Sequence, residues 1–139
     1  MLFQKIKAGY IVRLEKGEEI INVLSDFADK YKIEGGFLYG IGTVNDVTLG
    51  YYDAQRKDYL KQTFKGDFEL ASLTGNISLL KGRPMVHAHV VVSDANFTCL
   101  AGHLFSASIA ITGEVVILLT KDAIERVFDP QTGLNLLQL

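Results

Sequence analysis

Two apolar runs separated by a short polar break occupy residues 83–105, RPMVHAHVVVSDANFTCLAGHLF. The break, Ser93–Asn96, is made of residues that favour turns. The pattern therefore predicts two antiparallel strands, Pro84–Val92 and Phe97–Phe105, joined tightly. A hairpin of this kind restricts how the neighbouring strands can pair, so it constrains the fold more than any other stretch of the chain.

The length of the connecting loop sets the register of this hairpin. A three-residue loop at 94–96 pairs Ser93 with Phe97. Such a loop is typically a type I turn closed by a residue with positive φ, and Asn96 is one of the few non-glycine residues that tolerate it.

All three histidines of the chain, His87, His89 and His103, fall in the predicted hairpin. Because the side-chain period of a strand is two, His87 and His89 share one face, and the register places His103 directly opposite His87. Opposed Cβ atoms lie roughly 5 Å apart, so three imidazoles on this face can converge on one ion. Three nitrogen ligands with a fourth position open are typical of a divalent-metal site, most often zinc.

The alternative is that these histidines are partly buried, hydrogen-bonded and bind nothing. The metal hypothesis also depends on register, because a shift of one residue would turn His103 to the other face. Both interpretations remain open from the residues alone.

Two further side chains are candidates for chemistry near this face. Glu69 lies between Phe68 and Leu70, and a buried carboxylate there would need a partner such as an imidazole or a metal-bound water. Glu69 is therefore a candidate to support the site, with an exposed edge position as the alternative. Cys99 shares the face of His103 but lies roughly 13 Å along the strand, so we expect a buried, inert thiol.

Composition excludes several classes of protein. A chain of 139 residues fits one domain, and a net charge of −2 gives no support for binding nucleic acid. Cys99 is the single cysteine, so no intrachain disulfide forms and a reducing compartment fits. No apolar run reaches the roughly 20 residues of a membrane helix, and the N-terminus lacks a signal-peptide core, so we expect a cytoplasmic protein without a membrane partner.

One helix is expected at Glu18–Tyr31, where apolar residues recur at three- and four-residue spacing. The expected strands outside the hairpin are Leu2–Leu14, Gly36–Val44, Asp46–Asp53, Tyr59–Phe64, Glu69–Leu80, Glu114–Leu119 and Glu125–Phe128, with Ser106–Thr112 as a connection. The pattern predicts an α+β domain over 1–139, with a mainly antiparallel mixed sheet of about seven strands packed on one main helix. The apolar tail Leu134–Leu139 either folds back on the sheet or forms an interface in a homo-oligomer.

Three stretches of the sequence resemble segments of a known domain family. HAHVVVSDANFTCLAGHL resembles the histidine motif of the plant-and-prokaryote conserved (PPC) domain, which reads His-x-His, a Ser-Asp turn and Gly-Gly-His-Leu. GIGTVNDVTLGYYD and FELASLTGNISLLKGRP resemble two other segments of that family. Ala101 stands where the family usually has the first glycine, and because alanine is small the histidine geometry is expected to persist.

The resemblance implies a homotrimeric α+β domain in which His87, His89 and His103 cluster and hold a metal, with zinc as the expected ion. In plants the domain accompanies AT-hooks that bind A/T-rich DNA, but this chain has no AT-hook. No catalytic activity follows from the family. The first hypothesis is therefore a non-catalytic, metal-containing module that binds a small ligand or a protein partner.

Two other functions remain as alternatives. A metal-dependent hydrolase or lyase would use a zinc-bound water, with Glu69 as the only available base. A DNA-associated regulator is suggested by the plant relatives alone.

Overall fold

The chain folds into one helix and eight strands. The computed structural model describes all of residues 1–139, and its elements in chain order are β1 Leu2–Ile6, β2 Gly9–Glu15, α1 Ile20–Lys30, β3 Gly36–Asp53, β4 Asp58–Leu80, β5 Arg83–Ser93, β6 Cys99–Leu119, β7 Glu125–Asp129 and β8 Leu134–Gln138. The expected α+β class with one main helix is confirmed, with eight strands rather than about seven.

The helix α1 forms where the apolar periodicity predicts it. Glu19 caps its N-terminus, and the Glu19 carboxylate accepts hydrogen bonds from the backbone N–H groups of Ile21 and Asn22. This satisfies two of the donors that a helix start leaves unpaired. The buried residues of α1 form one stripe: Ile20, Leu24, Phe27 and Ala28. With eleven residues, α1 is not long and apolar enough to cross a membrane, and the chain has no other helix.

The strands are longer than the sequence suggests, and they contain fewer breaks. The two segments expected on either side of Asn45 form a single strand, β3, which passes through β-bulges at Gly40/Gly42 and Asn45/Val47. The segments expected before and after residue 65 likewise form the single strand β4, and the expected connection 106–112 lies inside β6. Bulges bend a strand without ending it, so glycine and polar residues mark bends here. At the N-terminus, the expected extended segment is a hairpin of β1 and β2.

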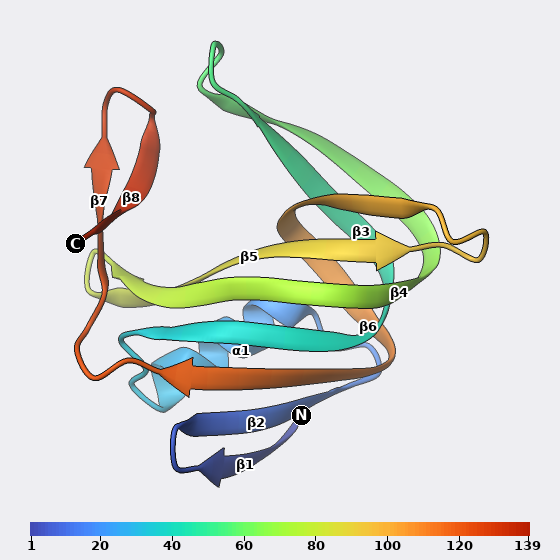
Figure 1. The fold of residues 1–139 in the computed structure, drawn as a ribbon, viewed down its shortest axis with the longest axis horizontal. Helices are drawn as coiled ribbons and strands as arrows, with labels where there is room; N and C mark the ends of the chain where they lie inside the picture. Colours follow the sequence, from blue (N-terminus) through green and yellow to red (C-terminus); the bar gives the residue numbers. More distant parts are fainter.

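Long, bent strands let the sheet curl on itself (Figure 1). The first part of β6 pairs with β5, whereas its last part pairs with β2 and with the start of β3. The sheet is mixed because β7 pairs with β4 in parallel, and all the other pairs are antiparallel. The helix α1 packs against β5 and β6.

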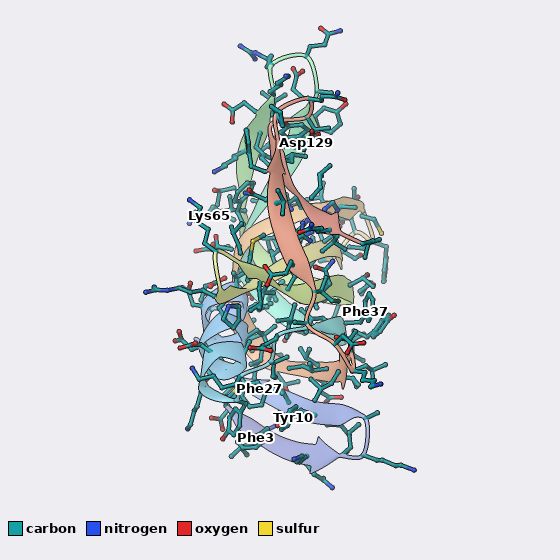
Figure 2. The ribbon with its side chains drawn as sticks, turned by 90° about the vertical axis from the view of Figure 1, so that its left-hand side faces the viewer. Phe3, Tyr10, Phe27, Phe37, Lys65 and Asp129 are labelled. Carbon is teal, nitrogen blue, oxygen red and sulfur yellow. The ribbon has the colours of Figure 1, made fainter.

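The helix covers only one side of the sheet (Figure 2). Along β5 the residues that point toward α1 are buried: Val86, Ala88, Val90 and Val92. The alternate residues, which include His87 and His89, point to the other side, which we call the open face. Figure 2 shows Phe37 on this open face, on the far side of the sheet from α1.

The C-terminal tail folds back onto its own chain. β8 pairs with β7, and this hairpin joins the sheet where Leu79 and Leu80 of β4 pair with β7. At the tip of the hairpin, Lys57 donates a hydrogen bond to the carbonyl of Pro130 at 2.9 Å. The fold-back still leaves apolar side chains of the hairpin exposed: Val127, Phe128, Leu136 and Leu139.

Candidate metal centre

The β5–β6 hairpin forms as predicted, but its register is different. Ser93 pairs with Cys99, so the loop has five residues, and His103 lies opposite His89 rather than His87. The Asp94 side chain explains the longer loop, because its Oδ1 accepts hydrogen bonds from the N–H groups of Asn96 and Thr98.

The residue with positive φ in this loop is Phe97, at 62°, and not Asn96 as expected. The register differs from the predicted one by two residues. Since the side-chain period of a strand is also two, His103 stays on the same face as the other two histidines.

The three histidine rings come together on the open face. Ring centroids are 5.3 Å apart for His87 and His89, 5.0 Å for His87 and His103, and 5.3 Å for His89 and His103. One nitrogen from each ring lies within 4.8 Å of the other two. His87 and His103 are half-buried and His89 is exposed, so the cluster is open on one side.

Aromatic rings hold His103 in place. The His103 ring lies 4.9 Å from Tyr59 and 4.8 Å from Phe105, measured between centroids. Gly50 pairs with His103 on the neighbouring strand, and a Cβ there would approach the Phe105 ring to 2.4 Å and the Tyr59 ring to 2.9 Å. The glycine therefore leaves the space that these two rings fill beside the histidine.

A buried arginine from the C-terminal hairpin reaches His87. Nη2 of Arg126 lies 3.1 Å from Nδ1 of His87 and 2.9 Å from Oδ1 of Asn76. Nε of Arg126 donates to Oγ of Ser78 at 2.8 Å, and its Nη1 donates to the carbonyl of Asn135 at 2.7 Å. These hydrogen bonds connect His87 to β4 and to the β7–β8 hairpin through one side chain, Arg126.

The surroundings keep two of the histidines neutral. Burial, and then the positive charge of Arg126, lower the pKa of His87 to about 4. Burial also lowers the pKa of His103, with smaller contributions from His89 and Lys61. A metal binds neutral imidazole, so at neutral pH an ion would compete with few protons at these rings.

The residues fit a divalent cation. Nδ1 of His103 is buried and has no hydrogen-bond partner, which is costly unless something else binds it. Three imidazoles are a donor set that zinc and similar ions accept, with a further position left for water or a ligand. His87, His89 and His103 would hold the ion, and such an ion would act as a Lewis acid at its open position.

The structure places the other two candidate residues away from the cluster. Glu69 is exposed and pairs with Ser93, four residues along β5 from His89, or roughly 13 Å. It lines a separate cavity of about 550 Å³ that also contains Asp94. Cys99 pairs with Ser93 and is exposed, so the expectation of a buried thiol is wrong.

Sequence reasoning missed Arg126 and Tyr59 as parts of this site. Both lie far along the chain from the histidine hairpin, in β7 and at the start of β4. The only signal was an arginine inside the short strand ERVFD, and an exposed arginine would give the same pattern.

Comparison with known proteins identifies the family. The model of the Plants and Prokaryotes Conserved (PCC) domain matches residues 1–121. The chain belongs to this family. It is the same family that the histidine motif resembles. The matched residues end before β7, so they do not include Arg126.

Solved structures of similar proteins extend over the whole PCC domain and beyond it. A proposed DNA-binding protein from Bacteroides thetaiotaomicron VPI-5482 is 34% identical, with 99% of this chain and 96% of that one covered and a TM-score of 0.95. A plant- and prokaryote-conserved protein from Pyrococcus horikoshii is 33% identical, over 99% and 95% of the two chains, with a TM-score of 0.88. A metal-containing protein from Archaeoglobus fulgidus is 33% identical, over 100% and 99%, with a TM-score of 0.87.

One curated relative contains a similar segment within a much longer chain. The bifunctional protein GlmU of Synechococcus sp. (strain JA-3-3Ab) is 30% identical over 129 residues. This covers 89% of the PCC-domain chain but only 19% of the GlmU protein.

Proposed function

We propose that this chain is a homotrimeric PCC-domain protein that binds one divalent metal ion at His87, His89 and His103 and serves as a non-catalytic binding and assembly module. Zinc is the expected ion, because it accepts imidazole ligands in an open three-nitrogen site. The observation that carries the proposal is the convergence of the three rings, with one nitrogen from each within 4.8 Å of the others. The similar protein from Archaeoglobus fulgidus is described as metal-containing, which supports it.

The absence of a nearby carboxylate favours binding over catalysis. Hydrolysis by a metal-bound water needs a general base within hydrogen-bond reach. Glu69, the only base that the sequence suggested, pairs with Ser93 at the end of β5, four residues along the strand from His89. The cavity beside His87 and His103 contains no acidic residue.

Exposed apolar residues on the open face support an assembly. The large side chains there are Ile11, Phe37, Tyr39, Ile41 and Leu118, each between 37% and 56% exposed. They lie on neighbouring strands, since Phe37 pairs with Leu118. A contiguous apolar surface of this kind usually marks an interface, and contact with further copies of the chain would bury it.

Elemental analysis of the purified protein tests the metal site. We expect one zinc ion per chain in the wild type and none in His103→Ala, because two remaining imidazoles bind the ion far more weakly. Loss of zinc with unchanged mass in solution and unchanged unfolding would assign the ion a functional role, and loss of both would assign it a structural one. Wild-type protein that takes up no divalent ion contradicts the proposal.

Size-exclusion chromatography with light scattering, which measures the mass of the protein in solution, tests the assembly. The expected mass is three times that of the chain, 15.4 kDa. A monomer at micromolar concentration would refute the trimer and leave the metal proposal intact. A charge introduced at the centre of the apolar surface, Tyr39→Asp, is expected to dissociate the assembly.

DNA association is the second candidate, because the similar protein from Bacteroides thetaiotaomicron is described as a proposed DNA-binding protein. A net charge of −2 provides no general attraction to phosphates. A gel-shift titration at two salt concentrations decides it: salt-sensitive binding to duplex DNA supports this function, and no shift removes it.

A further inference from the structure

Arg126 is a buried cation without an acidic partner. Its side chain belongs to a residue that is 9% exposed, and none of the ion pairs in the structure involves it. Its four hydrogen-bond partners are all neutral: Ser78 Oγ, Asn76 Oδ1, Asn135 O and His87 Nδ1. Burial of a charge costs free energy unless an opposite charge lies close to it. A bound anion would therefore stabilise this guanidinium.

The arginine lines a cavity next to the histidine cluster. The cavity has a volume of about 240 Å³, and its polar lining comes from Arg126, His87, His103, Tyr59 and Asn135. The rest of the lining is apolar: Met85, Leu134 and Leu136. The cavity therefore combines one positive charge with apolar side chains, which suits a small anion with a short hydrocarbon body.

The hydrogen bonds of Arg126 show which of its N–H groups are free. A guanidinium has five N–H donors and no acceptor. Four are used, one on Nε, one on Nη1 and two on Nη2, so the second N–H of Nη1 has no partner. Because Arg126 always donates, Nδ1 of His87 accepts, and the neutral His87 ring carries its proton on Nε2.

An ion on the histidines would release a second N–H. If His87 binds the ion through Nδ1, that atom no longer accepts from Arg126. If it binds through Nε2, the ring proton moves to Nδ1, which then cannot accept either. In both cases Nη1 and Nη2 of Arg126 each have one N–H without an acceptor, and a carboxylate can accept from two N–H groups of one guanidinium.

We propose that this cavity binds a small monocarboxylate, held by Nη1 and Nη2 of Arg126 with its hydrocarbon chain against Met85 and Leu134. This inference rests on the proposed metal site for one part: the ion strengthens carboxylate binding by freeing the second N–H and by adding positive charge. A monocarboxylate fits better than phosphate because the cavity offers one buried cation and an apolar wall. Phosphate, with more charge and no hydrocarbon, would leave that wall unused.

Calorimetric titration with butyrate tests the proposal, with butyramide as an uncharged probe of the same shape. Zinc-loaded wild type is expected to bind butyrate one to one, about tenfold or more tightly than butyramide, since the amide cannot make two charge-assisted bonds to Arg126. Arg126→Lys keeps the charge but loses the fork, so the preference for butyrate should fall about tenfold. Arg13→Lys is the matched control: Arg13 lies on β2, its side chain is 57% exposed and outside the cavity lining, and the substitution should leave the preference unchanged.

Equal binding of butyrate and butyramide by the wild type overturns the proposal, whether or not Arg126→Lys folds. Tighter binding of inorganic phosphate than of butyrate overturns the choice of carboxylate. The metal site is judged separately by elemental analysis. One outcome is that no zinc binds, the wild type prefers butyrate to butyramide, and Arg126→Lys shows no such preference. The carboxylate site at Arg126 is then supported, and the metal proposal fails. If zinc binds without a preference for butyrate, the metal site stands and this inference fails.

Discussion

One side of the sheet presents aliphatic side chains to α1, and the other side presents histidines and exposed aromatic rings. The contrast is sharpest along β5, where Val86, Ala88, Val90 and Val92 are each 7% exposed or less. The residues between them include His87 and His89, which belong to the candidate metal centre. A single strand therefore supplies the core with every second residue and the site with the others.

The two faces differ in how their side chains are stabilised. On the helix face, Phe27 contacts Phe3, Tyr10 and Tyr31 with ring centroids 4.6–5.2 Å apart (Figure 2). On the open face, polar groups depend on specific partners, and one of them, Nδ1 of His103, has none. Substitutions on the helix face should therefore change stability, and substitutions on the open face should change binding.

The largest effect is expected for Phe27→Ala on the helix face. Phe27 is 2% exposed, and truncation of a buried phenylalanine costs about 3–5 kcal/mol because it removes apolar contact and leaves a cavity. Urea unfolding followed by circular dichroism measures this loss. Zinc bound per folded chain should stay at the wild-type value, and a parallel loss of zinc would show that the two faces are not independent.

The next effect is a loss of stability at acid pH in the ion-free protein. His87 has a pKa of about 4 in the fold, because of burial and Arg126, against about 6.5 when unfolded. The unfolded chain therefore binds more protons between these values, and the free energy of unfolding falls as the pH drops from 6.5 to 4. The loss from this group is about 2 kcal/mol, because solvent reaches the half-buried ring and weakens the effect. Urea unfolding at several pH values measures the slope, which His87→Gln should reduce. An unchanged slope in that variant would contradict the assignment.

Gly75→Ala should affect both faces at once. Gly75 pairs with Ala88 on β5, and a Cβ there would lie 2.2 Å from the backbone oxygen of His87 and 2.9 Å from Cα of Ala88. Backbone atoms cannot move aside as a side chain can, so β4 and β5 must separate, at a cost of about 1–3 kcal/mol. Both the urea midpoint and the zinc affinity should fall. Gly66→Ala, which meets no atom within 4 Å but has a positive φ, is a control for backbone conformation alone.

The sequence could predict the face of each histidine but not its exact partner. Alternation of apolar residues in β5 fixes which side chains point to the core, so His87 and His89 had to share the open face. The partner of His103 depends on the loop, and the Asp94 side chain closes a five-residue loop by binding two backbone N–H groups. These hydrogen bonds favour a five-residue loop over a three-residue loop. The spacing of apolar residues is compatible with both loops, so it does not predict which one forms.

Long-range contacts explain the rest of what the sequence could not predict. Arg126 reaches His87 from a strand 39 residues away, through a two-residue parallel pairing of β7 with β4. No local pattern encodes that contact, because it depends on where the curled sheet places β7. The sequence also could not predict that β3 and β4 are continuous. Glycine and polar residues occur both at a β-bulge and at the end of a strand, so their presence does not distinguish the two.

The smallest effect is expected for Glu69→Gln, which tests the boundary of the candidate metal centre on the open face. Glu69 is exposed and lies roughly 13 Å along the strands from His89, so the substitution should change the free energy of unfolding by about 0.5 kcal/mol or less. Zinc affinity, measured by competition with a chelator, should equal that of the wild type. A carboxylate that supports metal ligands typically changes affinity about 10–100-fold when removed. A loss of that size in Glu69→Gln would therefore place Glu69 in the site and restore the general base that the hydrolase alternative requires.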